Sequence, residues 1–398
     1  MESLKEFSAY TRRSMSIRYS YAVRRNAIEF GMSPELLVEN AGEAVSDSIV
    51  RRMKGDRILV VCGSGEKGAI GLAAARHLAN SCDVRVILLG GIEEVHNQTS
   101  KFNIKMLDGL IEVVEIGEHN IDVLSSELKN ANAVLEAIAG IGVHGRISGV
   151  ARMAIQEINS SKKKVISIDV PAGINGDTGE TNVAYIKADE LLALHKVKKG
   201  LIRSKAVGSI IQLDVGIPLL AELGCGPGDF TYLGLHRSEY ANKYSSGRLL
   251  IVGGGRIYRG APVLAGFAAN AAFAALRSGT GYVTIAVPER IEDRLGPMAP
   301  GLIIRSIPEG KGASDVASEL NSIKHNVMVV GPGLESKDID FGIINRVVHE
   351  ETSKKNIVLI DGGAIKPLKD YRNMFNRRMI LTPHDGEFKE LTGINLEG

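Results

Sequence analysis

The sequence predicts an α/β protein made of two doubly wound domains. Short apolar runs that end in glycine or an acidic residue alternate with segments of helical periodicity, which is typical of parallel sheets covered on both faces. A length of 398 residues exceeds what one hydrophobic core usually serves. The 44% of hydrophobic residues can fill two cores, and the 45 glycines can supply the tight turns. Two domains, each with its own site, are therefore expected.

The first half of the chain predicts one parallel sheet. Pro34–Met53 has the apolar periodicity of a helix, and the strand-like run Arg57–Cys62 follows it. Similar runs recur with helical patterns between them, at Val84–Leu89, Ala133–Leu135, Val165–Ile168 and Gly208–Pro218. A glycine-rich stretch then breaks the pattern. We therefore predict a first domain at 1–222, a linker at 223–247 and a second domain at 248–398.

The second half predicts a second parallel sheet. It begins with Arg248–Val252, which ends in three glycines, and continues with an alanine-rich buried helix at Ala261–Arg277. Because the carboxyl ends of parallel strands meet at one edge, the glycines and polar residues that end these strands predict one ligand site. The remaining predicted strands are Tyr282–Val287, Val327–Val330, Ile357–Ile360 and Met379–Leu381.

Charge, cysteines and hydropathy exclude several classes of protein. A net charge of +2 gives no basis for nucleic-acid binding. The three cysteines show no metal-ligand spacing and fit a reducing compartment. The N-terminus has no apolar signal core, and the most apolar helix-like stretch is too short to span a bilayer. We expect a cytoplasmic homo-oligomer with no nucleic-acid or membrane partner.

Gly63-x-Gly65-x-x-Gly68 follows a strand, which matches the dinucleotide fingerprint, because glycines let backbone N–H groups approach a pyrophosphate. A hydride-transferring dehydrogenase would also need an acidic residue closing the next strand. That strand ends in Gly90-Gly91 instead, which disfavours the dehydrogenase alternative.

A set of motifs runs across the first domain: Leu37-Val-Glu-Asn-Ala-Gly42, Cys62 to Leu78 with the glycine turn, Glu136 to Arg146, Asp169-Val-Pro-Ala-Gly173 to Gly179, Lys198-Lys-Gly200, and Asp214-Val-Gly-Ile-Pro218. In order and spacing this set resembles the NAD(P)H-hydrate epimerase family. The resemblance implies a Rossmann-like domain that interconverts the R and S forms of hydrated NADH or NADPH, usually with a bound potassium ion.

The resemblance also implies roles for individual residues. Asp169 would contact substrate and is the candidate catalytic residue, Glu136 aligns with a potassium-binding aspartate, and Ala172 would face the ion through its backbone. Ile70 replaces a polar residue of the family's glycine loop and cannot move a proton. The substrate-binding candidates are Glu66, Lys67, Gly68, Gly140, Gly142, Arg146 and Asp169.

Lys67 stands where the family has a potassium-binding asparagine, while an acid remains at Glu136. We hypothesise that the Lys67 ammonium occupies the former potassium site and pairs with Glu136, since both cations satisfy oxygen ligands at similar range. The alternative is that Glu66 and Lys67 are ordinary exposed loop residues. His77 and His144 could suggest acid/base chemistry, but His77 lies in an apolar-periodic helix, which favours a packing role.

The second domain contains the motifs Gly253-Gly-Gly255 to Pro262, Arg277-Ser-Gly279-x-Gly281, Gly331-Pro-Gly333 and Thr382-Pro-His384-x-Gly-Glu387. With them it resembles the ADP/ATP-dependent NAD(P)H-hydrate dehydratase, a ribokinase-like enzyme. The resemblance implies ADP or ATP with Mg²⁺, and substrate contacts at Ala261, Gly333 and His384. It also implies that dehydration proceeds by phosphorylation of the hydrate hydroxyl and loss of phosphate.

The family's nucleotide loop and catalytic base follow the His384 motif, and we find no such stretch before Gly398. The usual Asp-Ala-Asp of the fourth strand is Asp361-Gly-Gly363 here. We expect the dehydratase domain to be incomplete in this sequence. Three functions stay open: a bifunctional repair enzyme for NAD(P)H hydrates, a dinucleotide-binding pseudoenzyme, or a ribokinase-like small-molecule kinase.

Overall fold

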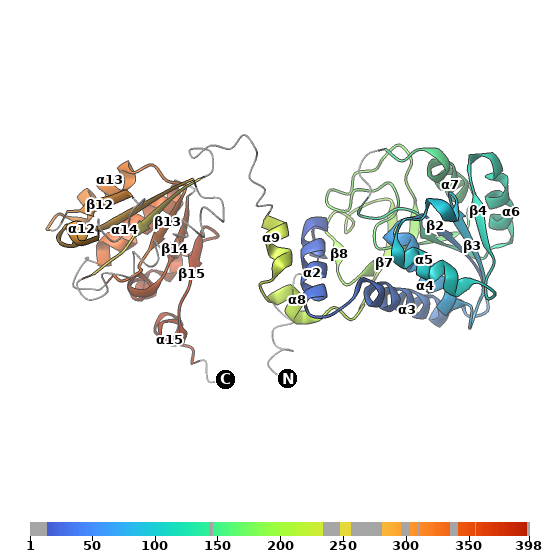
Figure 1. Ribbon diagram of the computed structural model, residues 1–398, viewed down its shortest axis with the longest axis horizontal. Helices are drawn as coiled ribbons and strands as arrows, with labels where there is room; N and C mark the ends of the chain where they lie inside the picture. The colour runs from blue at the N-terminus through green and yellow to red at the C-terminus, as the bar shows by residue number, and fades with distance from the viewer. Residues whose placement is uncertain are drawn as a thin grey trace. The chain divides into compact units, whose positions relative to one another are not determined.

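The structure is a computed structural model that forms two compact units, Met1–Gly234 and Leu235–Gly398 (Figure 1). The residues it describes are 14–142, 146–233, 247–255, 281–295, 303–308, 310–334, 341–354 and 356–395. Among them, no helix is both long enough and apolar enough to cross a bilayer.

The first unit is built on a sheet of seven described strands, all pairing in parallel. They are β2 (Arg57–Cys62), β3 (Asp83–Leu89), β4 (Val113–Ile116), β5 (Ala133–Ala137), β6 (Lys164–Ile168), β7 (Ala188–Leu194) and β9 (Val207–Leu213). Their order is β4-β3-β2-β5-β6-β7-β9, so the winding reverses between β2 and β5. The carboxyl edge at such a reversal is where doubly wound sheets bind ligands.

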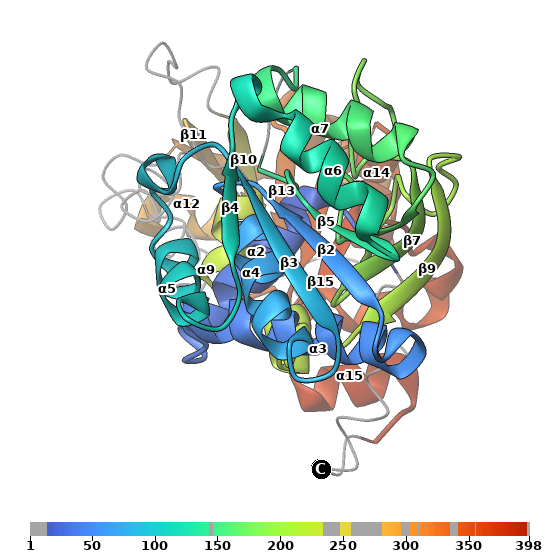
Figure 2. The ribbon, with the colours of Figure 1, turned by 90° about the vertical axis from the view of Figure 1, so that its right-hand side faces the viewer.

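Helices cover both faces of this sheet (Figure 2). Alternating side chains of β2 explain the two layers, because Val60 packs in one core and Val61 in the other. The helix α3 begins after Ser33, whose Oγ accepts from Leu36 N at 3.2 Å. One layer contains α3 (Pro34–Met53), α4 (Glu66–Leu78) and α5 (Gln98–Leu107), and the other contains α6 (Asp122–Asn130) and α7 (Gly149–Ser160).

A small helical layer closes the first unit beside the ligand edge. It consists of α2 (Ile17–Glu29), α8 (Leu219–Leu223) and α9 (Pro227–Leu233), and α9 lies alongside α2 (Figure 1). Buried Asn26 joins them, since its Oδ1 accepts from Gly228 N at 2.8 Å and its Nδ2 donates to Ala221 O at 3.2 Å. The first unit therefore extends into the segment 223–247. Nearby, β1 (Ser14–Met15) pairs with β8 (Val197–Lys198).

The second unit repeats the same winding in six described parallel strands. They are β10 (Arg248–Val252), β11 (Tyr282–Pro288), β12 (Ile303–Ile307), β13 (Val327–Val330), β14 (Ile357–Ile360) and β15 (Met379–Leu381), in the order β12-β11-β10-β13-β14-β15. The described helices are α12 (Glu289–Leu295), α13 (Ala313–Ser322), α14 (Phe341–Ser353) and α15 (Asp385–Thr392), with 3₁₀ segments at Gly362–Ala364 and Lys366–Met374. The core on one face joins the strands to α13 and α14.

The predicted fold class is confirmed, since both units are doubly wound parallel sheets. The predicted strand Gly208–Pro218 ends earlier, at Leu213, because Asp214 Oδ1 accepts from Gly216 N at 2.9 Å and Gly216 has φ +75°. Sequence patterns had not indicated β4, β7 or β12. The predicted helix Ala261–Arg277 lies outside the described residues.

Candidate active site

The turn between β2 and α4 is shaped by glycines that backbone atoms crowd. A Cβ at Gly63 would lie 2.1 Å from Ile138 O, and one at Gly68 would lie 1.8 Å from Gly63 O. A Cβ at Gly65 would have nothing within 4 Å. The first and third glycines are thus required by close backbone approach, and they let α4 begin at the crevice between β2 and β5.

Lys67, in the first turn of α4, is buried at the carboxyl edge of the sheet, with 8% of its surface exposed. Its Nζ donates to Glu136 Oε2 at 2.7 Å and to Val170 O at 2.8 Å. Longer contacts reach Ala139 O at 3.3 Å and Ser167 Oγ at 3.4 Å. Burial lowers the pKa of Lys67, and the Glu136 carboxylate opposes that lowering. Oxygen atoms from the ends of two neighbouring strands, β5 and β6, thus enclose the ammonium.

Glu136 is fully buried on β5, and both of its oxygens are hydrogen-bonded. Oε1 accepts from Ile138 N at 2.8 Å, and Oε2 accepts from Ser167 Oγ at 2.6 Å as well as from Lys67. Ala172 N is a more distant donor, at 3.4 Å. A buried charge is tolerated only when it is paired and hydrogen-bonded in this way, so Lys67 and Glu136 form one structural unit.

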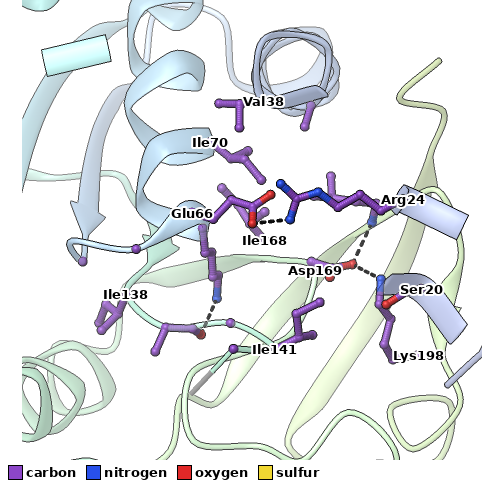
Figure 3. A pocket seen from close by; sticks show the side chains of 18 of the residues that line it. Ser20, Arg24, Val38, Glu66, Ile70, Ile138, Ile141, Ile168, Asp169 and Lys198 are labelled. Atoms are coloured by element: carbon purple, nitrogen blue, oxygen red, sulfur yellow. Dashed lines mark hydrogen bonds and ion pairs between the residues drawn. The ribbon is translucent and has the colours of Figure 1, made fainter. Parts of the chain in front are cut away.

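Asp169 follows β6 in the left-handed region, with φ +57°, which is uncommon for a residue other than glycine. Its Oδ1 accepts from Lys198 Nζ at 2.7 Å and from Leu194 N at 3.1 Å. Figure 3 shows Asp169 and Lys198 meeting at the side of the pocket. Strained backbone of this kind persists where surrounding contacts impose it, which is common at functional sites.

Helix α2 contributes polar side chains to the same pocket, among them Arg24 and Tyr21. Arg24 Nη1 contacts Glu66 Oε2 at 2.5 Å, so this ion pair joins α2 to the start of α4 (Figure 3). Tyr21 also lines the pocket, and burial together with the Glu66 carboxylate raises the pKa of its phenol. The segment before α3 is therefore part of the site.

These groups surround a cavity of about 590 Å³ at the strand reversal. Its walls are largely apolar, with a smaller number of polar groups among them, as in most small-molecule sites. Figure 3 labels the apolar residues Val38, Ile70, Ile138, Ile141 and Ile168 around it.

A second hollow of about 730 Å³ adjoins the cavity and shares Tyr21, Gly140 and Arg146 with it. Its lining is more polar than that of the first cavity and includes Asn175 and Asp177. Together the two hollows form one elongated cleft with an apolar part and a polar part. This form matches a dinucleotide, in which an apolar ring is joined to charged phosphates.

In the second unit, loops after neighbouring strands lie together at the carboxyl edge. Gly254 N donates to Pro332 O at 2.8 Å, which joins the turn after β10 to the turn after β13. Gly331 has φ +123°, and a Cβ there would lie 1.6 Å from Asp361 O. Thr382 Oγ1 donates to Asp361 Oδ1 at 2.7 Å. The predicted convergence of strand ends is thus present in the described part of this unit.

His384 begins α15 as its N-cap. Its Nδ1 accepts from Gly386 N at 3.1 Å and Glu387 N at 3.4 Å, while Glu387 Oε2 accepts from His384 N at 3.0 Å. The side chain is 73% exposed, so the imidazole is accessible while it caps the helix. Gly333 lies on the neighbouring loop after β13, and Ala261 is outside the described residues.

Most of the candidate residues in the first unit lie around one cavity. The candidates that line it are Glu66, Lys67, Gly140, Gly142, Arg146 and Asp169. Gly68 is buried behind the turn. Lys67 is not an exposed loop residue, contrary to the alternative considered from the sequence, because the oxygen cage buries it. His77 instead pairs with Glu39 at 2.9 Å, away from the cavity lining.

Sequence reasoning assigned no role to several polar residues that line the pocket, among them Tyr21, Arg24, His195 and Lys198. Lys198 lay in a quoted motif, but the others come from segments whose periodicity gave no sign of a site.

Two family models match the chain. Residues 34–200 match the family described as YjeF-related protein N-terminus, and residues 249–397 match NAD(P)H-hydrate dehydratase. A bifunctional NAD(P)H-hydrate repair enzyme of Pyrobaculum aerophilum is 34% identical over 383 residues, covering 94% of this chain and 74% of the relative. The chain belongs to this repair-enzyme family.

Other members of the repair-enzyme family cover both units in the same way. The enzyme of Hyperthermus butylicus is 35% identical over 385 residues, which is 94% of this chain and 69% of the relative. The enzyme of Archaeoglobus fulgidus is 34% identical over 373 residues, which is 92% of this chain and 74% of the relative. The family membership predicted from the motifs is therefore confirmed.

Proposed function

We propose that this chain repairs hydrated NADH and NADPH. The first unit interconverts the R and S hydrates, and the second unit is part of the domain that dehydrates the S form with an adenine nucleotide. The observation that carries the first activity is the elongated cleft at the strand reversal, with Asp169 at its polar side. Membership in the bifunctional family supports the pairing of the two activities.

In this proposal the residues of the cleft have separate tasks. The apolar wall near Ile70 and Ile168 receives the reduced nicotinamide ring and excludes water. The polar hollow, with Arg146, receives the phosphates and ribose. Asp169, whose Oδ1 is occupied by Lys198 and Leu194, accepts hydrogen bonds from the hydrate through Oδ2.

A potassium ion, implied by the family, does not fit beside Lys67. The oxygens of Glu136, Val170 and Ala139 already accept from the Lys67 ammonium. Within the described residues no cluster of three or more His, Cys, Asp and Glu side chains could hold a metal ion either. We propose that Lys67 supplies the positive charge at this place, so the exchange reaction needs no potassium.

Potassium rescue tests this role of Lys67. Lys67→Ala removes the ammonium but keeps Glu136 and the carbonyls. Potassium should therefore raise the melting temperature of the variant, whereas it should not change the melting temperature of the unchanged protein. Sodium and a bulky quaternary ammonium serve as controls. A potassium-dependent melting temperature or exchange rate in the unchanged protein would contradict the proposal.

For the second unit we propose ADP or ATP with Mg²⁺ as cofactor. Asp361, after β14, lies at the edge where the strand ends converge. Its carboxylate would face the Mg²⁺ ion. When bound, the nucleotide supplies the phosphoryl group that turns the hydrate hydroxyl into a leaving group. Cytoplasmic location and a homo-oligomeric state stay predictions from the sequence.

The test uses separately prepared R and S hydrates of NADH with the full chain, with and without Mg²⁺ and ADP or ATP. The R/S exchange is followed by chromatography, and recovery of NADH is followed by its absorbance. Exchange that Asp169→Asn reduces strongly would support the first activity. Binding of the hydrates without either reaction would favour a pseudoenzyme, and no binding would favour a small-molecule kinase.

A further inference from the structure

His195 is a buried histidine in the wall of the cleft to which neither the sequence motifs nor the proposed function assigns a role. It follows β7 with φ +59°, and its backbone N donates to Leu213 O at 2.9 Å. The side chain lines the same cavity as Asp169 and is 14% exposed. The ring is therefore held at the carboxyl edge of the sheet, next to where a ligand would lie.

Glu222, on α8, lies next to the imidazole ring of His195. Its Oε2 lies 3.3 Å from His195 Nε2, and its side chain is only 3% exposed. Among the described residues, neither carboxylate oxygen nor His195 Nε2 has an aligned hydrogen-bond partner. Buried polar atoms left in this state cost free energy, and they are found where function requires them.

The charged groups around His195 come from three segments. Glu222 approaches from α8, Lys196 and Lys198 follow on the same chain segment, and Asp169 lies beyond Lys198. Lys196 Nζ lies 3.8 Å from Glu222 Oε2. Burial lowers the pKa of His195, Glu222 raises it, and the two lysines lower it further.

We propose that His195, oriented by Glu222, exchanges a proton with the hydroxyl group of the hydrated nicotinamide ring during R/S exchange. This inference rests on the proposed epimerase function. A carboxylate next to an imidazole stabilises its protonated form and leaves the other nitrogen for substrate, an arrangement that supports acid/base catalysis on many folds. Nε2 faces Glu222, so Nδ1 is the nitrogen that serves the hydrate.

The step balances without an oxidant or reductant. The bond between the ring carbon and its hydroxyl oxygen breaks as the lone pair of the ring nitrogen forms a carbon–nitrogen double bond. Protonated His195 gives its proton to the departing oxygen, which leaves as water. Water then adds to the opposite face of the ring carbon and returns a proton to His195, so the catalyst is restored.

The test compares two histidine–glutamate pairs of the same unit. His195→Gln and Glu222→Gln change the pair in the cleft, while His77→Gln and Glu39→Gln change a pair outside it. We measure R/S exchange of NADH hydrate across pH, with the enzyme-free rate subtracted. His195→Gln should lower kcat for exchange about 100-fold with little change in hydrate binding, and the control variants should retain exchange.

The pH profile separates catalysis from a purely structural role. Exchange begins with protonated His195, so the rate should fall as pH rises through the pKa of that residue, below its ordinary 6.5. Because Glu222 raises this pKa, Glu222→Gln should move the falling limb to lower pH. The proposal is overturned if His195→Gln exchanges the hydrates at the full rate. It is also overturned if the falling limb of the pH–rate profile stays at the same pH in Glu222→Gln.

A nuclear magnetic resonance titration distinguishes this failure from failure of the proposed function. Adding the NADH hydrate to the full chain should shift the imidazole signals of His195 and leave those of His77 unchanged. Absence of exchange in the unchanged protein, with this shift present, refutes the epimerase function and the catalytic step together. Exchange without the shift refutes only the role of His195.

Discussion

Each unit buries a glutamate that pairs with a basic side chain, but the two pairs lie at opposite edges of their sheets. Glu136 and Lys67 lie at the carboxyl edge, where Lys67 lines a cavity. Glu351, on α14, meets His325 Nε2 at 2.8 Å just before β13, at the amino edge. Both glutamates are 0% exposed. Burial alone therefore does not identify a functional pair. The edge of the sheet at which the pair lies does so.

The pair in the second unit is satisfied from several sides. Asn356 Nδ2 donates to Glu351 Oε2 at 2.7 Å, and His325 Nδ1 contacts Ile323 O at 2.6 Å. These bonds join the end of α14 to the loops that enter β13 and β14. We interpret this pair as a structural anchor and the Lys67–Glu136 pair as part of a ligand site.

The largest effect should come from Lys67→Met, which leaves the Glu136 carboxylate buried and unpaired. Loss of one partner of a buried pair costs about 3–5 kcal/mol, so the free energy of unfolding of the first unit should fall by that order. Urea unfolding, with hydrogen exchange followed in β5, measures it. The double variant Lys67→Met with Glu136→Leu should recover part of this loss of unfolding free energy. A loss below about 1 kcal/mol in the single variant would contradict the interpretation of the two side chains as a buried ion pair.

The glycine turns at the two carboxyl edges should be equally intolerant of a side chain. Gly68→Ala and Gly331→Ala each place a Cβ within 2 Å of a backbone oxygen, at 1.8 Å and 1.6 Å, and should each cost about 1–3 kcal/mol or more. Gly65→Ala is the matched control, because its Cβ meets open space, and it should stay within about 0.5 kcal/mol. Thermal unfolding of the variants gives the comparison. Equal tolerance at Gly65 and Gly68 would refute the close-approach argument.

Acid should weaken the structural anchor selectively. Burial raises the pKa of Glu351, but hydrogen bonds from His325 and Asn356 lower it to about 2 from the usual 4.5. Its contribution is therefore complete above pH 4.5 and is lost as pH falls toward 2. We expect the second unit to lose about 1–2 kcal/mol over this range.

Glu351→Gln should abolish that part of the acid dependence while hydrate exchange in the first unit continues. Unfolding free energies at several pH values, with hydrogen exchange assigned to each unit, measure the effect. An acid dependence that is the same with and without Glu351 would show that other carboxylates carry it.

The sequence predicted those parts of the molecule that depend on local pattern. Strands β2 and β10 and helix α3 have the bounds that were predicted, because apolar runs and glycine turns act over a few residues. The parallel winding followed from alternation, and the convergence of strand ends followed from the winding.

The rest depends on contacts between distant segments. Arg24 reaches Glu66 over 42 positions, and Glu222 faces His195 only because α8 packs beside α2. Nothing in the local sequence of α2 or α8 carries this information. Local pattern could not indicate the Lys67–Glu136 pair, because 69 positions separate the partners. It was predicted only because the sequence differs from the resembled family at both positions.

The smallest effect should come from His384, and it separates capping from ligand contact. His384→Ala removes the acceptor for Gly386 N and Glu387 N, which should cost about 1 kcal/mol at this exposed helix start. His384→Asn keeps a capping acceptor and should restore that stability. If the exposed imidazole contacts the hydrate, both variants should lose binding of NADH hydrate to the second unit, measured by calorimetry against Lys366→Ala as a surface control. Hydrate binding could instead change in parallel with stability, so that it is lost in the alanine variant and restored in the asparagine variant. That result would mean that His384 only caps the helix.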